Sequence, residues 1–440
     1  MKLKAAIAAV LTACLLSGCN ITGLDAQTLM RPPKATGDRE AIHTALEESV
    51  QGNLILKYPT RGEYRSAITM YDLTGDGVEE AIAFCEAPEE NSGIQIAIVG
   101  KQEEEWSLLG TFVSTAMQVD QVAFGDIDGD GRNEVVVGWG SALSGANSIS
   151  VYSWSGQSLT ETVFPGSYSE MAVLDFTGDG RDEIFAARLA TTESPIAEAL
   201  IMNLQEGTPT VCGSAILDST VTKYVSISKG FLEAGRPGIV LDGQKNANTY
   251  ITEVLYWDAD QQSMKAPFMD TNSNYTERNI AVLSQDINND SLIEIPIVSQ
   301  LPGTGDSATD ENAYLTNWYH YDCDENTVVR IFSTSINATE GYRLMIPEAW
   351  RGRITTQTTA SKREVTFYEW VVSDEYPNGV LGQALLQIRV FTGEEWENSP
   401  SGYTILGERD NKVYAMALPH PENELSMQAE DVLNSFTIIV

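Results

Sequence analysis

Residues 126–134 read Asp126-Ile-Asp-Gly-Asp-Gly-Arg-Asn-Glu134, and the architecture of the chain can be worked out from this loop. Three gap-free copies of the pattern lie elsewhere, at residues 72–80 (DLTGDGVEE), 175–183 (DFTGDGRDE) and 286–294 (DINNDSLIE). Short runs rich in Val, Ile and aromatic residues flank each copy, which predicts two strands joined by an acidic turn. Self-similarity at a regular spacing indicates a repeat architecture.

The four copies begin at Asp72, Asp126, Asp175 and Asp286. Because the last interval is about twice as long as the first two, we expect a further repeat between Asp175 and Asp286 that has lost its aspartates. Residues 224–241 fit, as a strand at 224–228, a turn at 229–238 and a strand at 239–241. A second hairpin follows in every unit, with third strands at 94–99, 149–154, 199–204, 253–257 and 318–321. Fourth strands follow at 107–112, 159–164, 208–212, 264–268 and 328–332.

Five units of four strands, each of about 50 residues, predict a mainly β chain with about five propeller blades. Residues 60–335 resemble the FG-GAP repeat propellers, also called integrin-α-like or VCBS repeats. Many members of that family have seven blades, whereas five are counted here. Closure of the ring is therefore left open by the sequence.

The acidic loops carry oxygen-bearing side chains at positions 1, 3, 5 and 9, and a main-chain carbonyl at position 7. Such a set suits Ca²⁺, which takes six to eight oxygen ligands, and glycines at positions 4 and 6 allow the tight turn. The candidate ligands are Asp72, Thr74, Asp76, Val78 and Glu80; Asp126, Asp128, Asp130, Arg132 and Glu134; Asp175, Thr177, Asp179, Arg181 and Glu183; and Asp286, Asn288, Asp290, Leu292 and Glu294.

We expect calcium affinity to be highest at residues 126–134 and lowest at residues 286–294. Thr74 and Thr177 are weaker donors than an aspartate, and Ser291 replaces a glycine in the last loop. The alternative is a turn stabilised by its own Asp side chains without any metal. If calcium is bound, its expected role is structural, to stiffen the blades.

The first residues predict export. Lys2 and Lys4 precede an apolar run, and Leu16-Ser-Gly-Cys19 resembles the lipobox of bacterial lipoproteins. The resemblance implies cleavage of residues 1–18, lipid attachment at Cys19 and an extracytoplasmic protein tethered to the cell membrane. An ordinary secretory signal is the alternative. Residues 19–37 are then a tether, and residues 38–335 comprise a helix at 39–51 and the repeats.

The chain is strongly acidic, with 62 acidic and 27 basic residues and a formal net charge of −35. Cleavage before Cys19 removes two lysines and no acid, which gives −37. Such a charge is repelled by nucleic acid, so no nucleic-acid partner is expected. Apart from Cys14 and Cys19 only Cys85, Cys212 and Cys323 remain, which is not a disulfide framework.

Composition changes after residue 339, and residues 340–440 predict a separate α+β domain. Strands are expected at 342–346, 353–358, 365–371, 384–391, 403–406 and 413–418, followed by a helix at 426–436. The opening YRLMIPEAW (342–350) and the closing helix resemble the PsbP/Mog1-like sandwich.

No catalytic set is evident. His43, His320 and His420 lie in different regions without metal-ligand spacing, and neither a nucleophile elbow nor a phosphate-binding glycine loop occurs. We therefore predict a non-catalytic surface lipoprotein that binds a protein or glycan partner through loops on one propeller face. The alternatives are an envelope scaffold or assembly factor that docks through residues 340–440, and a hydrolase or lyase acting on polysaccharide or cell wall.

Overall fold

The structure, a computed structural model, describes residues 37–50, 53–87, 93–102, 105–141, 147–269, 274–305, 309–398 and 401–439. The predicted signal peptide, Cys19 and almost all of the predicted tether lie outside these residues. Within them the chain is mainly β and is arranged as several separate antiparallel sheets of four or five strands.

Each of the first four sheets is a meander of four consecutive strands. The first holds β1 (Ile68–Tyr71), β2 (Glu80–Glu86), β3 (Ile94–Gln102) and β4 (Glu105–Ser114). The second holds β5 (Gln118–Gly125), β6 (Glu134–Gly140), β7 (Asn147–Trp154) and β8 (Leu159–Tyr168). The third holds β9 (Glu170–Leu174), β10 (Glu183–Arg188), β11 (Ala197–Gln205) and β12 (Thr208–Leu217). The fourth holds β13 (Lys223–Glu233), β14 (Arg236–Asn246), β15 (Thr249–Asp258) and β16 (Ser263–Lys265).

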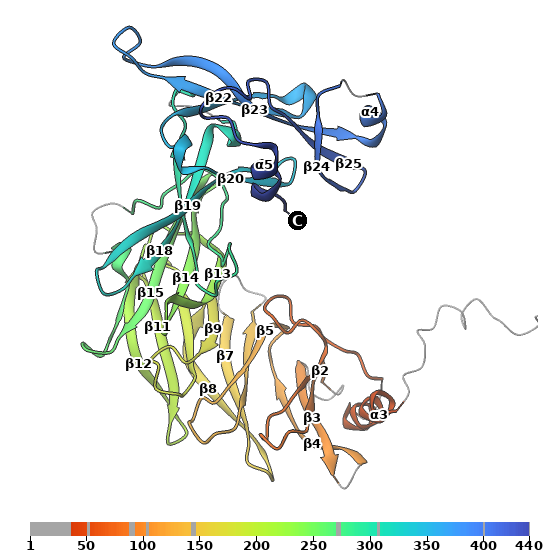
Figure 1. The fold of residues 1–440 in the computed structure, drawn as a ribbon. Helices are drawn as coiled ribbons and strands as arrows, with labels where there is room; N and C mark the ends of the chain where they lie inside the picture. The colour runs from red at the N-terminus through yellow and green to blue at the C-terminus, as the bar shows by residue number, and fades with distance from the viewer. Residues whose placement is uncertain are drawn as a thin grey trace, which may run out of the picture.

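The sheets stand face to face in a row. Their first strands pack against one another, β5 on β9 and β9 on β13, and their last strands do the same, β4 on β8 and β8 on β12. Figure 1 shows the row running from β2–β4 at the lower right to β18 and β19 at the left, so the first and fifth sheets stand at its two ends.

Alternating side chains fill the spaces between the sheets, as strand β6 illustrates. Val135 and Val137 point into the core shared with the first sheet, whereas Val136 points into the core shared with the third. Because successive side chains of a strand face opposite sides, a strand with a sheet on each face is buried throughout. Every residue of β6 is buried, which explains the unbroken apolar run EVVVGWG.

The fourth unit differs from the prediction at its first turn. A turn was expected at residues 229–238, but β13 continues to Glu233 and β14 begins at Arg236. Gly235 has a positive φ, a conformation that a glycine adopts without steric cost, so two residues suffice where the acidic loop has been lost. Strand pairing therefore extends almost to the tip of the hairpin.

The fifth sheet is shared between the repeats and the C-terminal segment. Its order is β17 (Ile295–Gln300), β18 (Tyr314–Asp322), β19 (Thr327–Asn337), β20 (Tyr342–Ile346) and β26 (Phe436–Ile438). The strand expected before its acidic loop is reduced to a single bridge between Gln285 and Glu294. The predicted boundary at 335–340 thus falls between β19 and β20, which are hydrogen-bonded neighbours.

A sixth sheet lies beyond the row. Its order is β21 (Ile354–Thr359), β22 (Glu364–Val371), β23 (Val380–Thr392), β25 (Lys412–Ala417) and β24 (Thr404–Arg409). Helix α4 (Gly393–Glu397) packs on β23 and β25 of this sheet, whereas α5 (Ala429–Ser435) packs on β20 of the fifth sheet. Short 3-10 turns lie at η1 (Pro267–Met269), η2 (Glu311–Ala313), η3 (Glu348–Trp350) and η4 (Ala360–Lys362). One apolar core joins this sheet to the fifth, because Leu301 and Leu315 pack with Trp350 and Phe367.

Helix α3 (Asp38–Val50), which was predicted at residues 39–51, covers the free face of the first sheet. Its buried side chains Ile42, Ala45 and Leu46 pack against small residues of β2 and β3, among them Ala83 and Ala97. The helix therefore closes the end of the row that has no neighbouring sheet.

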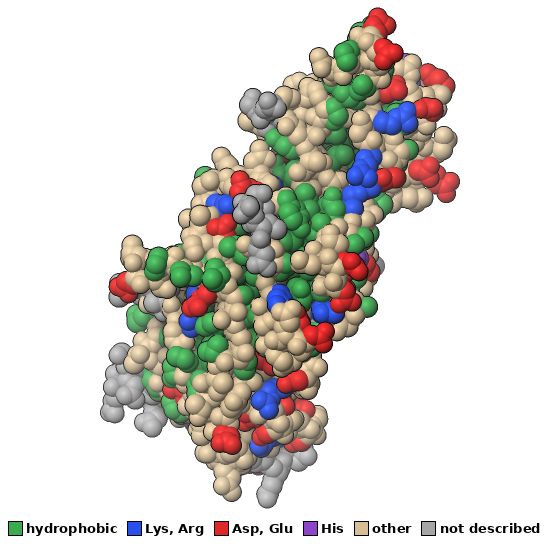
Figure 2. Space-filling view, turned by 90° about the vertical axis from the view of Figure 1, so that its left-hand side faces the viewer, with side chains coloured by type: hydrophobic (Ala, Val, Ile, Leu, Met, Phe, Trp, Pro, Cys, Tyr) green, Lys and Arg blue, Asp and Glu red, His purple; other side chains and the backbone are tan. Residues whose placement is uncertain are grey.

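One face of the molecule is shown in Figure 2, where hydrophobic side chains gather over the middle and acidic ones lie toward the upper end and the right-hand edge. The high negative charge is therefore unevenly distributed over this face. None of the helices in the described part of the chain is long and apolar enough to cross a membrane.

Candidate functional site

Three of the acidic loops directly follow β1, β5 and β9. The first strands of the sheets are called the inner strands below. Residues 72–80, 126–134 and 175–183 connect β1 to β2, β5 to β6 and β9 to β10. Because the three meanders run in the same direction, these connections lie along the same edge of the stacked sheets. Adjacent loops also touch, because the Asp126 N–H donates to the Asp182 carboxylate (3.1 Å) and the Asp182 N–H donates to the Asp126 carbonyl (3.1 Å).

All four loops share one hydrogen-bond pattern at position 1. In the second loop one oxygen of Asp126 accepts the N–H groups of Gly129 (2.7 Å) and Asp130 (3.0 Å), and the other accepts that of Gly131 (2.9 Å). Asp72, Asp175 and Asp286 accept equivalent main-chain donors. The first aspartate thus holds the turn, as the metal-free alternative requires.

The ninth residue of each loop is a buried glutamate that returns to the start of the loop. Glu80, Glu134, Glu183 and Glu294 each accept the N–H of the second loop residue, at 2.9–3.0 Å. That second residue is apolar and buried in all four copies, a feature that the sequence pattern left unassigned. Its members are Leu73, Ile127, Phe176 and Ile287. The loops are therefore anchored in the cores between the sheets.

The 126–134 loop brings together three of the side chains that the sequence suggested as ligands. One oxygen from each of Asp126, Asp128 and Asp130 lies within 4.8 Å of the others. Burial, with the neighbouring Asp128, raises the pKa of Glu134 to about 7, and burial likewise raises the pKa of Asp128. Hard oxygen donors at a turn with glycines at positive φ fit Ca²⁺. The Arg132 guanidinium pairs with Asp130 and has to give way to a cation there.

The 72–80 and 175–183 loops are not among the clusters of three such groups found in the described residues. Thr177 donates to Glu183 (3.1 Å), so this hydroxyl satisfies the carboxylate instead of facing a cation. Burial raises the pKa of Glu183 to about 7. Thr74 is different, since its hydroxyl is buried without a hydrogen-bond partner among the described residues. The order of calcium affinity among the loops stays a prediction.

The fourth loop brings Asp290 and Glu294 next to His320 of β18. No sequence spacing pointed to this histidine, because it reaches the loop by strand pairing. Asp286 serves the turn only, and Asn288 donates to Asp290 (2.9 Å).

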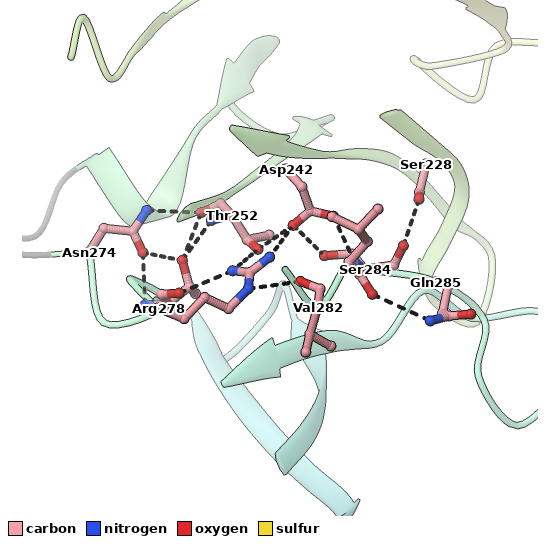
Figure 3. A network of polar contacts seen from close by, with 10 residues as sticks. Ser228, Asp242, Thr252, Asn274, Arg278, Val282, Ser284 and Gln285 are labelled. Carbon is pink, nitrogen blue, oxygen red and sulfur yellow. Dashed lines mark hydrogen bonds and ion pairs between the residues drawn. The ribbon is translucent and has the colours of Figure 1, made fainter. Parts of the chain in front are cut away.

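A buried ionic network fastens the connection between the fourth and fifth sheets. Figure 3 shows Arg278 lying among Asp242, Thr252 and Val282, and its guanidinium contacts all three. The Arg278 guanidinium is 2.8 Å from Asp242, and both side chains have no exposed surface. Asp242 also accepts hydrogen bonds from the Thr252 hydroxyl (2.6 Å) and from the Ser284 N–H (2.6 Å). Because these charged groups are paired with one another and with polar neighbours, the network is structural.

A polar pocket of about 680 Å³ lies at the opposite ends of the inner strands. Gln118, Glu170 and Lys223, the first residues of β5, β9 and β13, all line it. Three successive sheets therefore contribute to one wall. Further lining residues are Asn147, Ser169, Thr222, Tyr224 and Ser226.

Arg61 forms the floor of this pocket, and nothing in its sequence context indicated that role. Its guanidinium makes a bidentate pair with Asp120 (2.9 and 2.8 Å), contacts Glu170 and donates to the Ser169 carbonyl (2.8 Å). The Tyr168 hydroxyl donates to Asp120 as well (2.5 Å). Burial raises the pKa of Glu170, although Arg61 opposes this. The segment before β1 thereby ties the second and third sheets together.

These features define a class of protein: a row of antiparallel sheets, four of which carry an acidic loop, with the loop lost from the fourth sheet. The FG-GAP-like repeat family matches residues 126–186, which span the second and third of these loops. Among curated proteins no match was found. A rhamnogalacturonan lyase of Bacillus licheniformis is similar at 14% identity and a TM-score of 0.29, over 69% of each chain.

Proposed function

We propose that this protein is an exported, non-catalytic lipoprotein that binds a glycan through the polar pocket at the N-terminal ends of β5, β9 and β13. The pocket is the observation that carries the proposal. Its walls combine amide, hydroxyl, ammonium and carboxylate groups, which supply both donors and acceptors for a hydroxyl-rich ligand. Loops and strand ends on a rigid scaffold commonly carry binding sites.

The carboxylates around Arg61 support a binding role over a catalytic one. Asp120 and Glu170 are both held by Arg61, and Tyr168 takes up a further lone pair of Asp120. A general acid or base needs a free proton-transfer path to the substrate. These two groups are engaged in holding the sheets together.

The wider proposal follows the sequence. The repeats form propeller-type blades in an open row, the C-terminal segment is an α+β sandwich of the PsbP/Mog1 kind, and lipid at Cys19 tethers the chain outside the cytoplasm. Calcium is held by Asp126, Asp128 and Asp130, with Glu134 and the Arg132 carbonyl close by. Bound there, the ion supplies positive charge that offsets the repulsion among these carboxylates.

The division of the molecule into two faces supports separate roles. Acidic loops leave the C-terminal ends of the inner strands, and the pocket opens at their N-terminal ends. Strand β5 separates the two faces over its full length of eight residues. At about 3.3 Å of rise per residue, a cation on one face does not contact a ligand on the other. Calcium in this proposal stiffens the scaffold and does not bridge to the ligand.

The test is binding of the full chain to an array of envelope and plant polysaccharides, in calcium and in chelator. The double variant Lys223→Ala/Gln118→Ala removes two exposed groups from the pocket wall. Its matched control is Lys265→Ala/Gln261→Ala, a hydrogen-bonded Lys–Gln pair that is not among the residues lining this pocket.

We expect a retained glycan whose affinity falls at least about tenfold in the pocket variant and is unchanged in the control, since each lost polar contact is worth about 1 kcal/mol or more. Equal binding by both variants would place the ligand elsewhere. Capture of a defined protein in place of any glycan would replace the glycan proposal with a protein receptor.

A further inference from the structure

We propose that Asp290, Glu294 and His320 form a binding site for a zinc-class divalent ion, distinct from the calcium-type loops of the other sheets. The three side chains each place one ligand atom within 4.8 Å of the others. The His320 Nε2 atom lies 2.7 Å from Glu294 Oε1 and 3.6 Å from Asp290 Oδ2.

These distances fit a tetrahedral ion. Zinc binds imidazole nitrogen and carboxylate oxygen at about 2.0–2.2 Å, which holds neighbouring ligand atoms roughly 3.4 Å apart. The separations of His320 Nε2 from Glu294 Oε1 (2.7 Å) and from Asp290 Oδ2 (3.6 Å) lie on either side of that value. A small shift of the side-chain ends therefore completes the geometry.

The main chain orients each carboxylate. One oxygen accepts a main-chain N–H group, and the other faces His320. Glu294 accepts the Ile287 N–H on Oε2 (2.9 Å) and turns Oε1 toward His320. Asp290 accepts the Leu292 N–H on Oδ1 (2.9 Å) and turns Oδ2 toward His320. Backbone support of this kind fixes metal ligands in place.

Of the four sheets that carry an acidic loop, only the fifth has a histidine opposite the loop glutamate, as the strand register shows. Ile295 pairs with Tyr319, so Glu294 stands opposite His320. In the other three sheets, extending the strand register by one residue in the same way gives the residue opposite the loop glutamate. It places Gly100 opposite Glu80, Ser153 opposite Glu134 and Asn203 opposite Glu183. None of these three brings a nitrogen ligand of the imidazole type.

The loop itself has also changed. Position 7 is Leu292, whereas in the second loop Arg132 at this position places its guanidinium on Asp130. Among the described residues, the groups on Asp290 Oδ2 are the imidazole and the neutral Asn288 amide, so no lysine or arginine competes for it. A nitrogen donor with two carboxylates favours zinc, manganese or iron over calcium, which prefers an all-oxygen shell. Three protein ligands leave a fourth position for water.

The experiment uses the full chain, purified without a histidine tag and stripped with a chelator. Zinc binding is measured by titration calorimetry in excess calcium, and Co²⁺ is used as a spectroscopic probe for its visible d–d absorption. His320→Asn removes the nitrogen ligand, and Asp290→Asn removes an exposed carboxylate without altering the buried glutamate. His420→Asn is the matched control, because His420 also lies beside a carboxylate, that of Glu422 (3.1 Å).

We expect one zinc ion per chain in the wild type and in His420→Asn. Its affinity falls by more than about 100-fold in His320→Asn and by about tenfold or more in Asp290→Asn, and the Co²⁺ absorption is lost with His320. Unchanged zinc affinity in both His320→Asn and Asp290→Asn overturns the site. So does a zinc ion displaced by calcium, which would return this loop to the all-oxygen class. Should His320→Asn fail to fold, the Asp290→Asn result decides.

Discussion

Individual residues in this molecule matter most where charge has been buried. Asp242 and Arg278 have lost all contact with water, and burial lowers the pKa of Arg278 although Asp242 raises it. If the carboxylate is removed, no water can reach the Arg278 guanidinium to take over its hydrogen bonds and solvate its charge. The consequence of a single substitution there is therefore large.

Replacing Asp242 with Asn is expected to destabilise the protein by about 3–5 kcal/mol, the usual cost of leaving one charge of a buried pair alone. The free energy of unfolding in urea measures this. The control is Asp258→Asn, which breaks the more exposed pair of Asp258 with Lys265. That substitution should cost less than about 1 kcal/mol. Equal effects of the two substitutions would contradict a structural role for the network.

Glu253 predicts a pH dependence. It is buried, accepts the Asp218 N–H (2.7 Å) and the Tyr224 hydroxyl (3.3 Å), and burial raises its pKa to about 7. Because the folded state binds this proton more tightly than the unfolded state, its contribution to stability falls as the pH rises from about 4.5 to 7 and is constant above that range.

Glu253→Gln cannot ionise, and its amide oxygen can still accept the Asp218 N–H while its NH2 group donates to the Tyr224 hydroxyl oxygen. Relative to the wild type, the variant should therefore gain stability between pH 5 and pH 7.5, by an amount on the order of 3 kcal/mol at most. Thermal melts of both proteins at the two pH values check this. A difference that does not vary with pH would show that Glu253 titrates normally.

At the scale of single elements, the acidic loop is both a turn and a candidate cation site. Its hydrogen bonds persist in all four copies, whereas only residues 126–134 bring three carboxylates together in the described part of the chain. Turn formation is therefore the shared property, and we propose that calcium affinity depends on whether position 3 is Asp.

Calcium should raise the melting temperature of the wild type, and Asp128→Asn should remove most of that rise. Asn can still accept the Asp130 N–H that Asp128 accepts (3.0 Å). The turn is thus kept while one anionic ligand is lost. Asp179→Asn, in a loop without such a cluster, should leave the calcium effect unchanged. Melts with calcium and with chelator give the comparison. A calcium effect that survives Asp128→Asn would move the ion to another loop.

The loops and most strands were predictable from the sequence because their signals are local. An aspartate-rich turn between two apolar runs needs no knowledge of distant residues, and even the hidden fourth unit followed from the spacing. Arg61 and His320 could not be found in this way. Arg61 acts on Asp120 and Glu170 of two other sheets, and His320 reaches Glu294 only through the pairing of β17 with β18.

Over the whole molecule, the row of sheets and the C-terminal segment are coupled by β-pairing and by one apolar core. The composition change near residue 340 predicted a boundary between the repeats and a separate domain. It could not reveal that β20 continues the fifth sheet, because pairing between strands from different segments leaves no periodic signal.

A chain truncated after residue 339 is therefore expected to lose more than the sixth sheet. Removing β20 leaves β19 as an exposed edge and uncovers Leu301 and Leu315. Hydrogen exchange should become fast in β17–β19 and remain slow in β5–β12, which pack against other repeats. Full retention of protection in β17–β19 would mean that the repeats are independent of the C-terminal segment.

The pairing of β20 with β26 also sets an order in time. Strand β26 (Phe436–Ile438) is synthesised only after every strand of the sixth sheet, although it pairs with β20. The first three sheets can assemble one after another as they emerge, whereas the outer edge of the fifth sheet is covered only after the whole sixth sheet and β26 have been synthesised. Until then the nascent chain presents an unpaired strand edge, and this is the stage at which a chaperone would have most to protect.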